Sequence, residues 1–259
     1  MFILLMACAS DPNASGNSSS VSIDPSFLQS IPTGNGLVFM VVAGKRSSRK
    51  ETLKYALEDA ARRVSIFNGV TAEYIYANSN DSTLLGNNQW IHAALEYDKE
   101  GVEKYIEILK FDPDKRSDIM EIENAVIIRT IYPVSLSNPV FYLPVYYGKE
   151  KKPNWVDTPP SSIGGYTVGI GYSDKHSSTA ETWKKSFDEA IFSIVRSVDA
   201  SFRSEESNII NTSSMFGYSR TTEDFIYSLR TLAEFYVLDA WMDPQTKAVW
   251  TLAIARKAQ

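Results

Sequence analysis

The chain has 259 residues, of which 44% are hydrophobic, so it can form one large or two small domains with a hydrophobic core. Its 26 basic and 31 acidic residues give a net charge of −5, and no Lys/Arg-rich block could follow a nucleic-acid backbone. We therefore expect no nucleic-acid partner. With one cysteine and two histidines, no disulfide framework, zinc ribbon or thiol redox pair can be assembled from this chain alone.

The N-terminus combines an apolar run with the lone cysteine. Residues 1–7 are MFILLMA, Cys8 follows, and a tract rich in Ser, Asn and Gly comes next. This order resembles a bacterial lipoprotein signal, which implies that Cys8 carries the lipid and that residues 9–22 form a flexible tether. Because seven residues without Lys or Arg are too few for a complete signal peptide, we expect an upstream start codon. The alternative is a chance apolar start on a cytosolic protein.

Two stretches of the chain, 128 residues apart, begin alike. Residues 25–32 are PSFLQSIP and residues 153–160 are PNWVDTPP, each an aromatic residue between prolines. A glycine and a β-rich apolar run follow in both, over 36–44 and over 165–173. Short apolar runs bounded by turn residues are typical of strands. The pattern predicts that a second copy of the same unit begins near residue 150.

Both predicted strands are followed by a helix start. Ser48 to Glu51 and Ser178 to Glu181 match the capping box, in which the serine accepts from the amide three residues on. The apolar residues then recur at helical spacing, which predicts one buried stripe on each helix and a solvated opposite face. The stripes are Leu53, Leu57, Ala60, Val64 and Phe67 in the first copy, and Trp183, Phe187, Ala190 and Ile194 in the second.

The rest of each copy follows the same predicted order of a strand, a short helix and a closing hairpin. In the first copy these are 71–78, a helix with Val102, Ile106 and Leu109, and the strands 126–132 and 141–149. In the second they are 198–206, a helix with Phe225, Leu229 and Leu232, and the strands 236–242 and 249–257.

The predicted fold class is therefore α+β, with two tandem copies of a β-α-β-(α)-β-β unit whose helix packs on an antiparallel sheet. The copies occupy residues 23–149 and 150–259, joined by a linker at 149–153, and residues 1–22 hold the signal remnant and tether. No stretch after the N-terminus reaches the ~18 apolar residues of a membrane-spanning helix. We expect a protein anchored to the membrane and not embedded in it.

The second copy carries a resemblance to a known family. It resembles the bacterial lipoproteins typified by the twenty-kilodalton membrane-associated lipoprotein of Helicobacter, and flagellar outer-membrane assembly lipoproteins are similar. The resemblance implies a dodecin-like fold, a lipidated cysteine and no established catalytic activity. It rests on six residues over about 150–259: Pro153, Trp155, Gly169, Gly171, Asp239 and Trp241.

Structural roles explain most of these residues. Trp155 between prolines predicts a hydrophobic latch that packs the linker onto its own domain. Gly169 and Gly171 alternate on one strand, so they share a face, where glycine permits close approach of the helix. A dinucleotide-binding pattern would need a third glycine at Asp174, and we exclude it.

The sequence contains no complete phosphate-binding, calcium-binding or hydrolase motif. Gly44-Lys45 lacks the phosphate-loop glycine, since Phe39 stands there. The acidic turn 112–123 has Arg116 at a calcium-ligand position. No G-x-S-x-G occurs, and neither His92 nor His176 stands beside a recognisable nucleophile.

We therefore predict a non-enzymatic interaction or scaffold protein of the cell envelope, on the outer membrane or its periplasmic face, with no catalytic residue, cofactor or metal. Its expected partners are the membrane, through the lipid on Cys8, and other envelope proteins or a second copy. The alternative is a binding protein for a small aromatic ligand in a pocket between helix and sheet, since the chain has 5 Trp, 14 Tyr and 12 Phe. Aromatic residues on strands, however, more often belong to a core.

Overall fold

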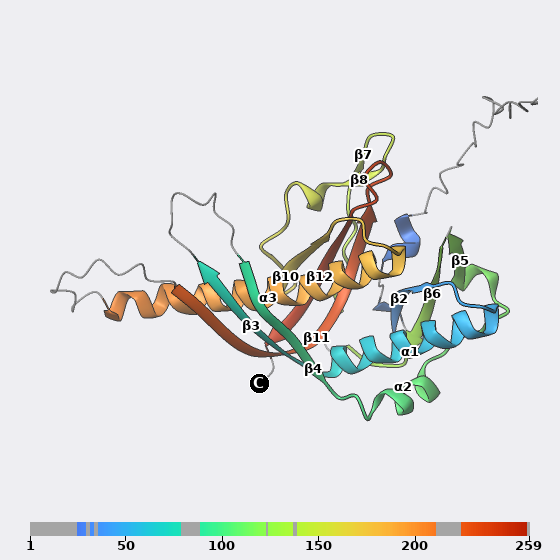
Figure 1. Cartoon of the computed structure of the whole chain (residues 1–259), viewed down its shortest axis with the longest axis horizontal. Coiled ribbons are helices and arrows are strands. Elements are labelled where there is room, and N and C mark those ends of the chain that lie inside the picture. Colours follow the sequence, from blue (N-terminus) through green and yellow to red (C-terminus); the bar gives the residue numbers. More distant parts are fainter. Residues whose placement is uncertain are drawn as a thin grey trace, which may run out of the picture.

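A computed structural model of the chain describes residues 25–29, 32–33, 36–78, 89–122, 124–136, 139–210 and 224–257. Cys8 and the predicted tether 9–22 lie outside these residues. Two antiparallel sheets and three α-helices account for most of the described chain (Figure 1). The mixed α+β class is therefore as predicted.

The smaller sheet has the strand order β1-β2-β6-β5. Its strands are β1 Pro32–Thr33, β2 Gly36–Gly44, β6 Ala125–Tyr132 and β5 Ile119–Ile122. The larger sheet has the order β4-β3-β11-β12-β10-β9. Its strands are β4 Gln89–Tyr97, β3 Val70–Asn78, β11 Asp224–Met242, β12 Val249–Lys257, β10 Tyr166–Ser173 and β9 Ser162–Ile163.

The helices are α1 Arg49–Asn68, α2 Val102–Ile108 and α3 Thr179–Ile210, with short 3₁₀ turns η1 Pro25–Leu28, η2 Arg116–Asp118 and η3 Asn154–Val156. In Figure 1, α1 lies across β2 and β6 of the smaller sheet, while α3 crosses the strands of the larger one. A separate two-stranded hairpin pairs β7 Tyr146–Tyr147 with β8 Lys152–Pro153. None of the described helices is long and apolar enough to cross a membrane.

The central strands are buried on both faces. In β2, Met40 and Val42 face a cluster around α3, whereas Phe39 and Val41 face a second cluster around α1. The strands β6 and β12 alternate between the same two clusters. This explains why the run GLVFMVVAG is continuously apolar and shows no alternation with polar residues.

Both helix caps form as the capping boxes predict. The Ser48 hydroxyl accepts from the Glu51 amide at 3.2 Å, and the Ser178 hydroxyl accepts from the Glu181 amide at 3.1 Å. The carboxylates differ from the expectation, because Glu51 accepts from Ser47 and Glu181 from Ser177 instead of reaching back to the cap amide. The predicted stripes are buried, with Leu57 only partly so. The opposite side of α3 is not all solvated, since α3 also packs against β2.

Gly169 and Gly171 let α3 lie directly on β10. A methyl group at Gly171 would lie 1.8 Å from the Ser186 carbonyl oxygen, and one at Gly169 would lie 2.4 Å from the Ala190 carbonyl oxygen. Both positions therefore exclude any larger residue, as the packing interpretation expects. The Ser186 hydroxyl also donates to the Gly171 carbonyl at 3.2 Å.

Two predicted elements of the second half are wrong. Residues 198–206, predicted as a strand, belong to α3, which continues to Ile210. Residues around Phe225, Leu229 and Leu232, predicted as a helix, lie in the 19-residue strand β11. The first nine residues of β11 pair with β3 and the remainder pairs with β12, so long-range pairing overrides the local helical spacing.

The closing hairpins are right in one half only. β11 and β12 form the hairpin predicted over 236–242 and 249–257. In the first half, β6 pairs with β2 and β5, and 141–145 is extended chain outside both sheets. Moreover β3 and β4 join the larger sheet, and each hydrophobic cluster contains residues from both halves. A boundary near residue 150 therefore separates the two halves of the sequence, but both hydrophobic clusters extend across it.

Candidate functional site

The segment between β6 and β9 forms an arm that we call the linker hairpin, residues 139–157. It runs extended to Val145, turns through β7 and β8, and ends in η3. Asn154 closes it, because its amide donates to the Val145 carbonyl at 2.8 Å and its side-chain oxygen accepts from the Val145 amide at 3.2 Å. Figure 1 shows β7 and β8 projecting at one end of the molecule.

A buried carboxylate fixes the linker hairpin to β11. Asp239 is 0% exposed, and its Oδ2 accepts from the Trp155 indole nitrogen at 2.7 Å and from the Tyr146 hydroxyl at 2.9 Å. Trp155 itself is fully buried, which agrees with the predicted latch. The pairing of β11 with β12 shifts register between Val237 and Asp239. Such a bulge re-aims one side chain, here the carboxylate.

The N-terminal end of the described chain joins the same network. Gln29 follows η1 and donates from Nε2 to the Tyr146 hydroxyl at 3.0 Å. The hydroxyl therefore accepts from Gln29 and donates to Asp239. The segment entering from the N-terminus, the linker hairpin and β11 meet at one point.

Burial makes Asp239 electrostatically unusual. Loss of solvent raises its pKa to about 7, although the hydrogen bonds from Trp155 and Tyr146 act in the opposite direction. Its second oxygen, Oδ1, is buried and accepts no hydrogen bond from the described part of the chain. Burial and the neighbouring carboxylate also raise the pKa of Tyr146. The carboxyl group therefore takes up its proton at a much higher pH than an ordinary aspartate does.

Four of the six residues behind the family resemblance converge here. Pro153 pairs with Tyr146 in the hairpin, and Trp241 donates from its indole nitrogen to the Glu150 carbonyl at 3.4 Å. With Trp155 and Asp239 they hold the linker hairpin on β11. Gly169 and Gly171 lie elsewhere, on the helix-facing side of β10. Sequence reasoning gave no role to Tyr146 or Gln29, since neither stands in a motif.

The extended part of the linker hairpin presents hydrophobic side chains to solvent. Alternate residues point outward, while Val140, Tyr142 and Tyr146 between them are buried or half-buried. We call the outward set the apolar stripe; its members and their exposed fractions are Phe141 (71%), Leu143 (86%), Val145 (51%) and Tyr147 (61%). Contiguous exposed apolar residues mark surfaces that contact something else. The sequence could not reveal the stripe, because FYLPVYY is apolar at the inward positions too.

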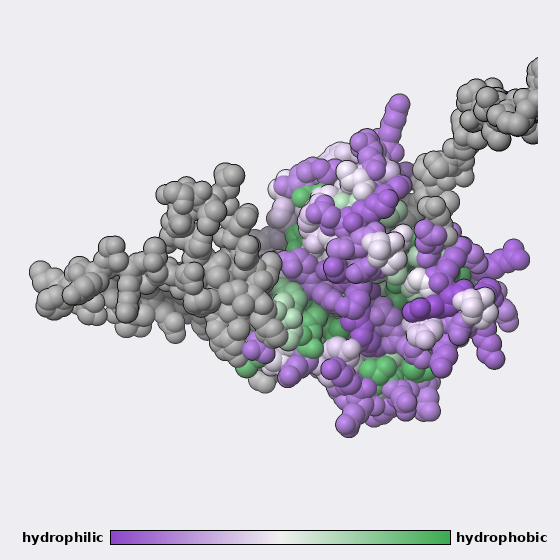
Figure 2. All heavy atoms as spheres, viewed as in Figure 1, coloured by the Kyte–Doolittle hydropathy of each residue, from purple (hydrophilic) through white to green (hydrophobic). Residues whose placement is uncertain are grey.

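The face seen in Figure 2 is covered mainly by hydrophilic residues, with several hydrophobic patches between them. Exposed apolar residues that stand singly are normal on protein surfaces. The apolar stripe is distinguished by four such residues in alternation on one extended segment.

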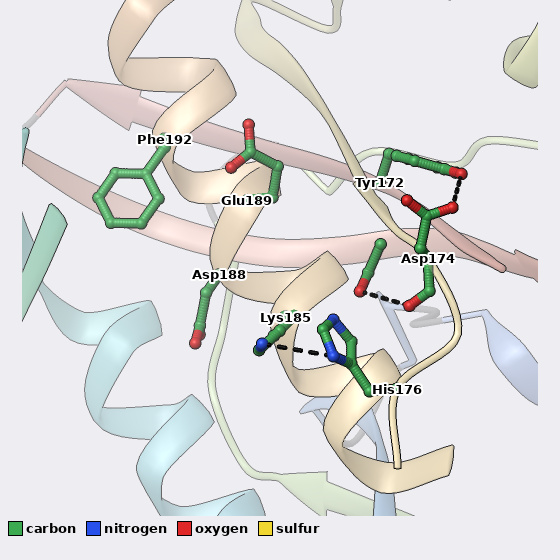
Figure 3. Close-up of a pocket in the computed structure, with 8 residues that line it drawn as sticks. Tyr172, Asp174, His176, Lys185, Asp188, Glu189 and Phe192 are labelled. Atoms are coloured by element: carbon green, nitrogen blue, oxygen red, sulfur yellow. Dashed lines mark hydrogen bonds between the residues drawn. The ribbon is translucent and has the colours of Figure 1, made fainter. Parts of the chain in front are cut away.

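A pocket of about 390 Å³ opens to solvent beside the N-terminal half of α3. Figure 3 shows Tyr172 directed at Asp174, and Lys185 directed at His176, whose Nδ1 lies 3.4 Å from the lysine nitrogen. Two of its three acidic groups are in ion pairs, with Asp188 2.6 Å from Lys184 and Glu189 2.5 Å from Arg196, and the third, Asp174, accepts from the Tyr172 hydroxyl. The lining is therefore mixed and charged, unlike an enclosed apolar ligand site.

A second charged cluster joins α1 to α3. Arg63 is nearly fully buried, lies 3.3 Å from Asp59 and stacks its guanidinium 4.0 Å from the centre of the Phe187 ring. Arg62 contacts Asp59 at 2.6 Å and Asp188 at 3.9 Å. Burial raises the pKa of Asp59, but Arg63 and Arg62 outweigh it and hold this pKa below its ordinary value. The cluster is placed to hold the helices together.

Over the described ranges, no group of three or more His, Cys, Asp and Glu side chains could hold a metal ion. The predicted lipid-attachment residue, Cys8, and the side chain of His92 lie outside what the structure describes. Comparison of the chain with protein-family models, with curated proteins and with solved structures gave no match.

Proposed function

We propose that this chain is a lipid-anchored envelope protein that acts as a non-enzymatic interaction or scaffold module. The observation that carries the proposal is the apolar stripe, which stays exposed on a segment that hydrogen bonds from Tyr146 and Trp155 to Asp239 fix to β11. Folding normally buries such residues, because burial of apolar surface stabilises the folded state. The four exposed side chains contribute little of this stabilisation. A surface kept in this state serves contact with another molecule.

The proposed anchor agrees with the place where the chain enters the fold. Cys8 follows an apolar run and has no second thiol to pair with. Sixteen residues separate it from Pro25. Such a tether, if flexible, spans about 20–24 Å root-mean-square, comparable to the radius of a domain of this size.

The polar groups favour a structural role over catalysis. Asp239 is enclosed by Trp155 and Tyr146, so its proton is kept from solvent and from a substrate. In the open pocket, Asp188 and Glu189 are paired with Lys184 and Arg196, and Asp174 accepts from Tyr172. General acid or base chemistry needs a perturbed group that a substrate can reach. This open and charged pocket lends no support to the small-ligand alternative.

We also propose that the two halves descend from one dodecin-like unit of the lipoprotein family named above. Matching hydrogen bonds support this proposal: the Arg46 amide donates to Thr52 Oγ1 at 2.9 Å, and the His176 amide donates to Thr182 Oγ1 at 3.0 Å. The strand pairs also correspond, since β2 pairs with β6 as β10 pairs with β12. In each case the strand pair carries the capped helix that follows its first strand.

Detergent-phase partitioning tests the anchor. The protein is expressed in a bacterial host from its full reading frame, beside a Cys8→Ser variant. We expect the parent chain in the detergent phase and the variant in the aqueous phase, because two or more acyl chains anchor stably. Recovery of both chains in the aqueous phase would contradict the proposal.

A further inference from the structure

We propose that the apolar stripe is seated in the interfacial layer of the lipid bilayer, so that the protein lies on the membrane through the linker hairpin as well as through its anchor. This inference deepens the proposed function, since it names the bilayer as what the apolar stripe contacts, and it rests on that proposal for the anchor. The stripe itself is a property of the described residues. The two can therefore fail separately.

The chemistry of the stripe suits a bilayer interface. Phe141, Leu143, Val145 and Tyr147 form one face of the extended segment, and Tyr147 places a phenolic group at its end. Aromatic side chains with one polar tip are favoured at the boundary between headgroups and acyl chains. Residues 139–148 contain no charged side chain. Inserting the stripe thus buries no charge.

Lysines border the stripe on one side. Lys149 and Lys151 are exposed in the turn after β7, and neither forms an ion pair with a described residue. Lysine stems can lie along apolar surface while the ammonium group reaches the headgroups. Because the whole chain carries a net charge of −5, apolar contact and not general electrostatic attraction must dominate.

The backbone of this segment disfavours pairing with an added β-strand, whether from a second copy or from another protein. Pro144 stands at the centre of the stripe's segment and supplies no amide hydrogen. A proline in this position interrupts any ladder that an added strand would form. Val140 to Leu143 make no backbone–backbone hydrogen bond with described residues, so the segment offers side chains rather than a continuous strand edge.

The geometry places the stripe near the proposed anchor. Gln29, only four residues after Pro25, bonds to Tyr146, which lies between the outward residues Val145 and Tyr147. The turn η1 also packs on β11, the strand that carries Asp239. The place where the described chain begins and the apolar stripe are therefore joined by one network.

Vesicle co-sedimentation tests the inference with the full chain carrying Cys8→Ser, which removes lipidation and leaves the stripe intact. The vesicles are phosphatidylethanolamine with phosphatidylglycerol, and pure phosphatidylcholine in a second series. We expect Leu143→Ser or Phe141→Ser to lower the partition coefficient about tenfold, as loss of one large apolar contact does. Leu229→Ser, at an exposed leucine of β11 outside the stripe, should change it less than twofold. Thermal unfolding confirms that each variant is folded.

Similar binding to both lipid series supports an apolar contact. The inference would be overturned if the parent chain sedimented with neither lipid. It would also be overturned if Leu143→Ser and Leu229→Ser lowered vesicle binding equally, or if binding were confined to the anionic vesicles and unaffected by Leu143→Ser. A concentration-dependent dimer in sedimentation velocity that Leu143→Ser abolishes would assign the stripe to a second copy, and so overturn it too. None of these results depends on whether Cys8 is lipidated.

Discussion

The indole nitrogen of Trp155 donates a 2.7 Å hydrogen bond to the buried carboxylate of Asp239, 84 residues further along the chain. This bond joins the linker hairpin to β11, and Tyr146 adds a second bond to the same oxygen. Because Tyr146 lies between Val145 and Tyr147 of the apolar stripe, its bond to this carboxylate holds the stripe in position.

Stability should depend on pH through Asp239. An unfolded aspartate titrates near pKa 3.9, whereas burial raises the folded pKa to about 7, so the folded state binds the extra proton between these values. The associated stability is present below pH ~4 and is lost as pH rises through about 7. Between pH 4.5 and 8 the free energy of unfolding of the parent chain should fall by about 2–4 kcal/mol. In Asp239→Asn this fall should be absent. Urea unfolding at both pH values measures it, and parallel pH profiles for the two chains would contradict it.

Replacing Trp155 by Phe should separate the hydrogen bond from the packing. The ring still fills most of its site, but the buried carboxylate loses one of two donors, so we expect about 1–3 kcal/mol less stability. Trp250→Phe is the control, because its half-buried ring packs on Trp241 at 5.3 Å and has no such bond. The two variants are compared by the denaturant concentration at the midpoint of unfolding. Equal losses in both variants would show that the hydrogen bond is unimportant.

Gly171→Ala should be among the most destabilising single changes in the chain. The added methyl group would lie 1.8 Å from the Ser186 carbonyl oxygen, which belongs to the α3 backbone and cannot move alone. We expect a loss above ~3 kcal/mol or no folded protein. Gly69→Ala provides the comparison, since nothing lies within 4 Å and its φ of 168° is ordinary extended backbone. Thermal melting of both variants checks this, and a mild effect at Gly171 would mean that α3 lies further from β10.

Arg63 should contribute more than a surface ion pair. Its guanidinium is nearly fully buried between Asp59 and the Phe187 ring, so Arg63→Ala leaves a partly uncompensated carboxylate and a gap between α1 and α3. We expect a loss of ~3 kcal/mol or more. Lys54→Gln breaks the exposed pair with Glu58 and should change stability by less than ~0.5 kcal/mol. Comparable effects in both variants, measured by urea unfolding, would argue against a structural role for this cluster.

Sequence patterns predicted those features that depend on neighbouring residues. The caps at Ser48 and Ser178 form because each bond spans three residues, and Gly169 and Gly171 meet α3 because strand alternation fixes their common face. Features set by distant segments were predicted wrongly or not at all. The helix α3 continues past Val198 because no glycine or proline stops it before Ile210.

The strand β11 illustrates the opposite case. Phe225, Leu229 and Leu232 have helical spacing, yet β3, from the first half of the chain, supplies their backbone partners. The candidate site was missed for the same reason. Gln29, Tyr146 and Asp239 come from three separate parts of the sequence, and only the fold brings them together. Asp239 and Trp155 were recognised through a resemblance, without any indication that they touch.

Intact-mass spectrometry of the chain purified from the membranes of its own cells tests the envelope assignment most directly. The account predicts a mature chain that begins at Cys8 and carries a diacylglyceryl group together with an amide-linked acyl chain. Digestion should then give an N-terminal peptide from Cys8 with the added lipid mass. A mature chain that retains residues 1–7, with an unmodified Cys8 thiol, would contradict the account.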